Sequence, residues 1–221
     1  MDNNHLIFDF QSSTPCCTKV VEEMAPYWNE LWGNPSNTNN RSGVFASAAV
    51  EVSREKIASY LNINPKRLIF TSGATEANNL GLVGHARAKA QLIGKPGHII
   101  TVSTEHHAVL DPLRQLQKEG FRLTELQPNK EGLINIEQLS EAFEKDTFLV
   151  SVMAANNEIG VLQPIGDIGS FCKRKGIAFH SDAAQAFGYL DLDPDKFRID
   201  LMSLSAHKIY GPKGIGALVI R

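Results

Sequence analysis

The sequence has few cysteines, no long apolar run and no excess of charge of one sign. Its three cysteines are an odd number, and the adjacent Cys16 and Cys17 rarely pair with each other, so a disulfide framework is excluded and a reducing compartment is expected. No apolar run is long enough to span a bilayer, and residues 1–5 contain no positively charged leader. We therefore expect a cytoplasmic protein with no signal peptide and no membrane partner.

The charge balance and the missing nucleotide fingerprints narrow the function further. A net charge of -2 offers no basic surface for nucleic acid. Neither GxGxxG nor a Walker loop occurs, so a single phosphate is a better candidate ligand than a nucleotide. Hydrophobic residues form 43% of the 221 positions, which is enough for the buried core of one large domain or two small ones.

Apolar runs of strand length alternate with helical patterns along most of the chain. This alternation predicts an α/β fold with a largely parallel sheet flanked by helices. The expected strands are residues 6–10, 67–71, 98–102, 122–126, 147–153, 178–181, 201–204 and 215–220, and the expected helices are 18–32, 44–61, 76–92, 108–119, 136–144 and 165–175, with Pro26 ending or kinking the first.

The chain is organised around Lys208, which follows the strand at 201–204 and precedes a Gly-Pro turn. A surface lysine usually lies among other charges on a helix, whereas this one is preceded by the small residues Ser205 and Ala206. A lysine presented at the end of a strand can form a Schiff base with a carbonyl compound or with pyridoxal phosphate. An ordinary lysine in a glycine-rich loop explains the stretch equally well, so other motifs must decide.

Four further motifs end neighbouring strands. Residues 71–79 place small side chains at a helix start, which suits a phosphate but also suits an ordinary helix cap. His106 or His107 could stack on an aromatic cofactor, although a capped loop histidine explains the pair as well, and they lack the spacing of a zinc site. The Asn156-Asn157 pair offers directed hydrogen bonds or simply a turn. Asp182 could keep a pyridinium nitrogen protonated, or could cap a helix.

Considered together, the five motifs favour one site over five separate caps. A phosphate-binding loop, a histidine, an amide pair, an aspartate and a lysine follow successive strands. The carboxyl ends of such strands form the edge at which doubly wound sheets bind ligands. The sequence therefore predicts a pyridoxal phosphate site at this edge and no metal site.

These motifs resemble those of the cysteine desulfurases (NifS/IscS-like), within the class V aminotransferase group of fold-type I pyridoxal phosphate enzymes. The matching segments are residues 71–76, 104–106, 156–160, 182–185 and 205–214, together with Asp9 and residues 33–36 near the N-terminus. The resemblance covers nearly the whole chain. It implies the large domain of this enzyme class, with a mixed, mainly parallel seven-stranded sheet over residues 16–221, while residues 1–15 belong to the small domain.

The resemblance also implies a role for each matching residue. Lys208 would hold pyridoxal phosphate as a Schiff base and later move the α-proton of the substrate, and Asp182 would pair with the ring nitrogen. His106 would stack on the ring and donate or accept a proton. The remaining contacts would come from Gln185 for the phenolic oxygen, Asn157 for the substrate carboxylate, and Ala74, Thr75, Ser205 and His207 for the phosphate.

The implied activity is conversion of L-cysteine to L-alanine, with sulfur passed to an acceptor protein in a homodimeric enzyme of iron–sulfur cluster assembly. Two features depart from the family pattern. Asn39 and Asn40 stand in a loop where members carry a histidine, and members continue well beyond Arg221 with a cysteine loop and most of the small domain. A chain incomplete at its C-terminus is therefore expected, and Cys172 is interpreted as a packed residue. An inactive cofactor-binding fragment, a selenocysteine lyase and an aminotransferase stay open as alternatives.

Overall fold

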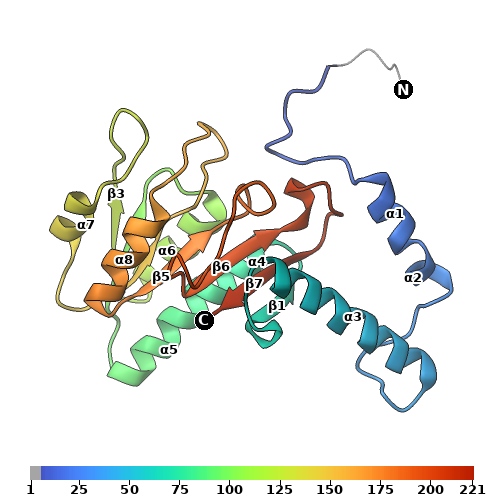
Figure 1. Cartoon of the computed structure of the whole chain (residues 1–221). Coiled ribbons are helices and arrows are strands. Elements are labelled where there is room, and N and C mark those ends of the chain that lie inside the picture. The colour runs from blue at the N-terminus through green and yellow to red at the C-terminus, as the bar shows by residue number, and fades with distance from the viewer. Residues whose placement is uncertain (1–5) are drawn as a thin grey trace.

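The computed structural model describes residues 6–221 as a seven-stranded sheet with helices on both faces (Figure 1). The expectation for residues 1–5 lies outside the described residues. The strands are β1 (Leu68–Thr71), β2 (His98–Val102), β3 (Arg122–Leu126), β4 (Thr147–Ser151), β5 (Ala178–Asp182), β6 (Leu201–Ser205) and β7 (Gly216–Ile220). The helices are α1 (Thr18–Met24), α2 (Pro26–Asn29), α3 (Arg41–Tyr60), α4 (Ala74–Asn78), η2 (Asn79–Val83), α5 (Gly84–Ile93), α6 (His107–Lys118), α7 (Ile136–Ala142) and α8 (Ile165–Lys175), with the short turns η1 (Pro65–Arg67) and η3 (Ala206–Lys208).

The sheet is mixed and mainly parallel, in the order β1-β7-β6-β5-β4-β2-β3. The strands from β6 through β3 run parallel, and β7 pairs antiparallel with both β1 and β6. This confirms the expected fold class. Because the parallel strands share one direction, the segments that follow β2, β4, β5 and β6 reach the same edge of the sheet.

Two apolar layers hold the helices on the sheet. One cluster joins α3, α7 and α8 to one face, and a second joins η2, α5 and α6 to the other. β4 contributes to both layers, with Val150 in the first and Leu149 in the second, as alternation along a strand requires. All five β4 residues are buried, which is typical of a parallel strand covered on both faces.

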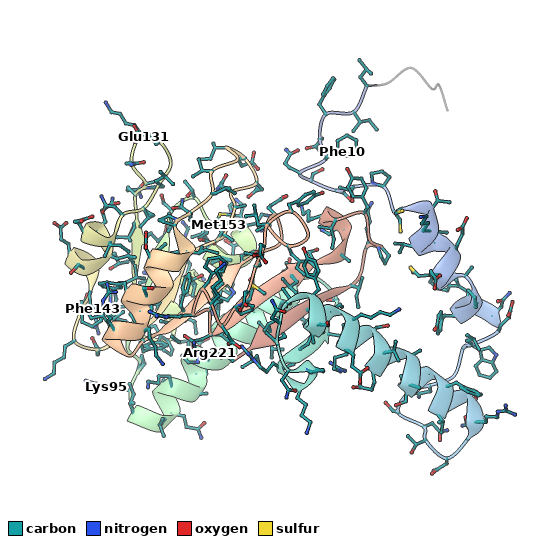
Figure 2. The ribbon with its side chains drawn as sticks, viewed as in Figure 1. Phe10, Lys95, Glu131, Phe143, Met153 and Arg221 are labelled. Carbon is teal, nitrogen blue, oxygen red and sulfur yellow. The ribbon has the colours of Figure 1, made fainter. Side chains whose placement is uncertain are left out.

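The N-terminal region differs from the expectation. The predicted strand at residues 6–10 is wrong, because residues 6–9 form no strand and Leu6 and Phe8 are more than 80% exposed. An apolar run becomes a strand only where a partner strand completes its hydrogen bonds, and no strand within residues 6–221 pairs with this segment. Figure 2 shows Phe10 on this coil, away from the packed helices and strands. The predicted break at Pro26 is confirmed, since α1 ends at Met24 and α2 begins at Pro26.

Gly169 provides a test of the packing of α8. A Cβ atom at this position would lie 1.9 Å from the carbonyl oxygen of Phe197. We expect Gly169→Ala to lower the free energy of unfolding by about 1–3 kcal/mol, the usual range for overpacking a core, as measured by urea denaturation. Gly84→Ala is the matched control, because a Cβ atom added there would meet no atom within 4 Å. Equal midpoints for the two variants would contradict this packing of α8.

Among residues 6–221, no helix is both long enough and apolar enough to cross a membrane.

Candidate active site

A cavity of about 690 Å³ opens at the carboxyl edge of the parallel strands. Segments that follow β1, β2, β4, β5 and β6 line it, together with residues from the N-terminal coil. All nine residues singled out from the sequence line this cavity: Ala74, Thr75, His106, Asn157, Asp182, Gln185, Ser205, His207 and Lys208. The fold therefore brings the five strand-end motifs together, while the role of each residue stays a prediction.

Lys208 lies in η3, directly after β6. Its Nζ atom donates to the backbone carbonyl oxygens of Gln11 (2.5 Å) and Ser12 (2.9 Å). Burial lowers the pKa of the Lys208 amine, against the opposing charges of Asp182 and Asp9. A lowered pKa increases the neutral fraction of an amine, and only the neutral amine can attack a carbonyl carbon.

Asp182 ends β5 on the floor of the cavity and is 5% exposed. Its Oδ1 accepts from the backbone N–H of Ala184 (2.9 Å), and its Oδ2 accepts from Nδ2 of Asn78 (2.7 Å). Burial raises the pKa of this carboxyl, while the two hydrogen bonds and the charges of His106 and Lys208 act in the opposite direction. The structure shows no ion pair to Asp182 within the range 6–221. A buried carboxylate that makes no ion pair suits a cationic ligand atom.

The start of α4 forms a narrow backbone cradle. Gly73 has φ 156° and ψ 179°, a conformation that is essentially restricted to glycine. A Cβ atom on Gly216 would lie 2.6 Å from the Cα atom of Gly73, so only glycine permits this approach. The first backbone N–H groups of a helix lack partners within the helix and point toward a ligand. The cradle, with Ser205 and His207 beside it in the cavity lining, fits a phosphate group.

His106 and Asn157 come from the loops that follow β2 and β4, which lie on the other side of β5 from β6 and Lys208. The Nδ1 atom of His106 accepts from the backbone N–H of Ala108 (3.0 Å), which places the proton of the neutral ring on Nε2. His106 also caps α6. This cap uses Nδ1 and is compatible with the predicted ligand role of the ring. Asn157 donates one hydrogen of its Nδ2 to the carboxylate of Glu158 (2.7 Å), and the second Nδ2 hydrogen can serve as a donor to a ligand.

The N-terminal coil is the part of the site that the sequence did not indicate. Thr14 donates through its backbone N–H to the carbonyl oxygen of His207 (2.9 Å), and its Oγ1 accepts from the backbone N–H of Tyr210 (2.8 Å). Nε2 of Gln185 donates to the carbonyl oxygen of Gln11 (2.8 Å), so a ligand contact through that amide requires it to leave Gln11. Local patterns carry no signal for these contacts, because they join segments more than 170 positions apart.

Two buried polar residues behind the cavity escape a sequence-based search for site residues. Asn78 is fully buried and holds Asp182, and Glu105 is 6% exposed. A signal exists for Asn78, since a polar side chain on the inner face of a helix is unusual and calls for a partner. Glu105 lies inside a motif in which the neighbouring histidine is the more obvious functional candidate.

The cysteines lie outside the cavity lining. Burial raises the pKa of the Cys172 thiol to about 12, so it is a thiol at neutral pH and not a nucleophile. Its side chain is 1% exposed and belongs to the core cluster of α8, which confirms the interpretation as a packed residue. In the described part of the chain, no group of three or more His, Cys, Asp or Glu side chains could hold a metal ion.

The residues present fit pyridoxal phosphate at its phosphate, its ring nitrogen and its aldehyde. The cradle at Gly73 matches the phosphate, the buried carboxylate of Asp182, which makes no ion pair, matches a protonated ring nitrogen, and the amine of Lys208 matches the aldehyde. The three features share one cavity, and its volume exceeds that needed for such a molecule.

Comparisons with known proteins agree with this chemistry. The family model "Aminotransferase class-V" matches residues 6–221. The chain is 49% identical to "Cysteine desulfurase IscS" of Dechloromonas aromatica, over 98% of this chain and 53% of that protein. It is also 49% identical to "Probable cysteine desulfurase, mitochondrial" of Schizosaccharomyces pombe, over 98% of this chain and 42% of that protein.

Solved structures show the same similarity in three dimensions. The chain superposes on "SspA in complex with cysteine" with a TM-score of 0.94 at 43% identity, covering 98% of this chain and 61% of that one. It superposes on a "NifS-like protein" with a TM-score of 0.90 at 37% identity, covering 97% and 58%. The chain thus spans about half the length of the curated relatives it matches.

Proposed function

The chain belongs to the class-V aminotransferase family, among the cysteine desulfurases of the IscS/NifS kind, and from this premise we propose that its cavity binds pyridoxal phosphate and serves the desulfuration of L-cysteine to L-alanine. The observation that carries the proposal is the presence of Lys208 and Asp182 in one cavity beside a phosphate cradle. The bound cofactor supplies an electron sink for the substrate's α-carbon.

The chain's own residues contribute binding, orientation and proton transfer. Lys208 would hold the cofactor through its aldehyde group, and its amine would take the proton from the substrate's α-carbon. Asp182 holds the proton on the ring nitrogen, because a carboxylate favours the charged form of a partner base. Asn157 would bind the substrate carboxylate through its second Nδ2 hydrogen, and Gln185 would bind the phenolic oxygen after leaving Gln11.

His106 and the cradle fix the position of the ring. The imidazole of His106 would stack on the cofactor ring, while its Nδ1 accepts from the backbone N–H of Ala108 and its Nε2 carries the proton of the neutral imidazole. Ala74 and Thr75 bind the phosphate through the start of α4, with Ser205 and His207 completing the contact. A fixed ring lowers the entropic cost of bringing the α-proton to Lys208.

The sulfur acceptor in this proposal is a thiol other than the three in the chain, because Cys16, Cys17 and Cys172 do not line the cavity. We take residues 16–221 as the cofactor-binding domain and residues 1–15 as an N-terminal segment of a second, smaller domain. Thr14 bonds to His207 and Tyr210, which supports a functional connection between the two. We further propose that the protein is cytoplasmic and acts in iron–sulfur cluster assembly.

We also propose that the protein acts as a homodimer. No residue of α1 or α2 is buried, and Tyr27, Trp28, Trp32 and Phe45 expose about half or more of their side chains. Aromatic surface of this extent is typical of a protein–protein interface. Sedimentation equilibrium tests this: a monomer at micromolar concentration would contradict it, and Trp28→Lys should weaken a dimer.

The function is tested by adding pyridoxal phosphate to the chain and recording its absorption spectrum, followed by assay of alanine and sulfide from L-cysteine with a thiol reductant. We expect a protein-bound band, and weaker binding of pyridoxal, which lacks the phosphate that the cradle holds. If the chain binds the cofactor but releases no alanine, it is a binding fragment. Turnover of selenocysteine alone would identify a selenocysteine lyase, and formation of a keto acid would identify an aminotransferase. Absence of any band contradicts the proposal.

A further inference from the structure

Glu105 is a buried acid with one satisfied oxygen. It follows β2 and precedes His106. Its Oε1 accepts from the backbone N–H of Met153 (2.5 Å), the second residue after β4, and Met153 is buried. Its Oε2 is buried and has no hydrogen-bond partner among the described residues. A buried polar atom without a partner is rare and calls for an explanation.

The bond from Met153 is one of two that join the loop after β2 to the loop after β4. The second runs from Nδ2 of Asn156 to the carbonyl oxygen of Thr104 (2.8 Å). The first loop carries His106 and the second carries Asn157, and both of these residues line the cavity. Two bonds between neighbouring loops fix the spacing of the side chains that the loops carry.

Glu105 and Asp182 are two buried carboxyl groups, and the negative charge of Asp182 opposes ionisation of Glu105. Asp182 receives two hydrogen bonds and is stabilised by the charges of His106 and Lys208, whereas Glu105 receives one hydrogen bond and faces the charge of Asp182. Burial accordingly raises the pKa of Glu105 well above its usual range. Both oxygens of Asp182 accept hydrogen bonds, whereas Oε2 of Glu105 accepts none among the described residues, so the negative charge is more stable on Asp182 and the proton on Glu105.

We propose that Glu105, as a protonated carboxylic acid, is a positioning residue that fixes the His106 loop to the Asn157 loop and leaves the negative charge of the cavity floor on Asp182. The inference about the proton concerns the chain alone, and the inference about positioning rests on the proposed function. Glutamine mimics a protonated glutamate, because its Oε1 can accept from Met153 and its Nε2 carries hydrogen where the acid carries its O–H.

The first experiment needs no ligand. Urea denaturation of the wild-type chain and of Glu105→Gln is measured between about pH 5 and pH 8, with the exposed Glu131→Gln as the matched control. Below the unfolded pKa of a glutamate, about 4.3, both states hold the proton. Above it only the folded state does, so wild type loses stability relative to Glu105→Gln by up to tenfold in the folding equilibrium constant per pH unit, until the folded pKa is passed. A difference independent of pH would overturn the protonated form.

The second experiment measures binding of pyridoxal phosphate. Glu105→Gln should keep the dissociation constant within about twofold, whereas Glu105→Leu, which leaves the N–H of Met153 unsatisfied, should raise it about tenfold. A double-mutant cycle should show that Glu105→Leu and Asn157→Ala are not additive. Additive effects, or equal weakening by Gln and Leu, would overturn the positioning role. If wild type binds no cofactor while the pH difference is present, the proposed function fails, the positioning role falls with it, and the protonated form of Glu105 stands.

Discussion

Lys208→Ala is expected to abolish covalent capture of pyridoxal phosphate. The cavity contains one further lysine, Lys213, which is exposed and follows the Gly-Pro turn, whereas Lys208 is partly buried and close enough to Asp182 for the two charges to interact. Borohydride reduction followed by peptide mass spectrometry measures the attachment directly. Wild type should carry the cofactor mass on the peptide containing Lys208, and the variant should lose the bound absorption band.

The control for this experiment is Lys118→Ala, an exposed lysine in the last turn of α6. It should retain the band at wild-type intensity. Lys208→Ala should also keep its fold, because the amine bonds only to carbonyl groups of the N-terminal coil, so circular dichroism should match wild type. Attachment of the cofactor mass to Lys213 in wild type would contradict the assignment.

Most of the fold could be predicted from the sequence, because the parallel core has strong local signals. The bounds of β2, β3 and α8 agree with the expected ones, since each is a clear periodic segment between turn residues. Where the signal was ambiguous, the prediction failed. Residues 6–10 have the composition of a strand, but a strand requires a neighbour, and no local pattern reports whether one is present. The helix expected at 76–92 is divided by the π-helical segment η2.

The sequence could predict which residues share the site, because the order of the strands brings them together. It could not predict the individual contacts between them. Parallel strands deliver their carboxyl ends to one edge, so the motifs after β2, β4, β5 and β6 could be placed in one cavity from their order alone. The contacts of Lys208 with Gln11 and Ser12 depend on the path of a coil that has no periodicity. The interaction between Glu105 and Asp182 depends on their burial, and the identity of a polar residue in a sequence does not show that its side chain is buried.

Asp182→Asn is expected to separate stability from function. At neutral pH the buried carboxylate is unfavourable, because its pKa is raised in the folded state and folding therefore opposes its ionisation. That penalty begins above the unfolded pKa of an aspartate, about 3.9, and grows with pH until the folded pKa is passed. An asparagine carries no charge and avoids the penalty. The ligand-free variant should therefore be as stable as wild type at pH 7 or more stable, which thermal denaturation measures.

The same change should damage the cofactor site. Asparagine cannot neutralise a protonated ring nitrogen, so the ring loses its proton and withdraws electrons less strongly from the substrate. We expect removal of the substrate's α-proton to slow by about two to three orders of magnitude, the scale for loss of one preorganised electrostatic group. Exchange of the α-proton of L-alanine with deuterated water measures this step without an acceptor for sulfur. Asp191→Asn, an exposed position, is the control and should exchange at the wild-type rate.

The two effects of Asp182→Asn have opposite signs, and this makes the prediction specific. A carboxylate that served only to cap the turn through Ala184 would lose stability on replacement, because the amide competes poorly for that N–H and turns a donor toward Asn78. The rate of α-proton exchange in the variant would then fall only in proportion to the loss of folded protein. A carboxylate whose role is to provide a negative charge lowers the free energy of unfolding of the ligand-free chain. Binding of a cation beside it offsets that loss. A lower melting temperature together with unchanged exchange would show that Asp182 is structural, and the cavity would lose the feature that distinguishes it from an ordinary phosphate site.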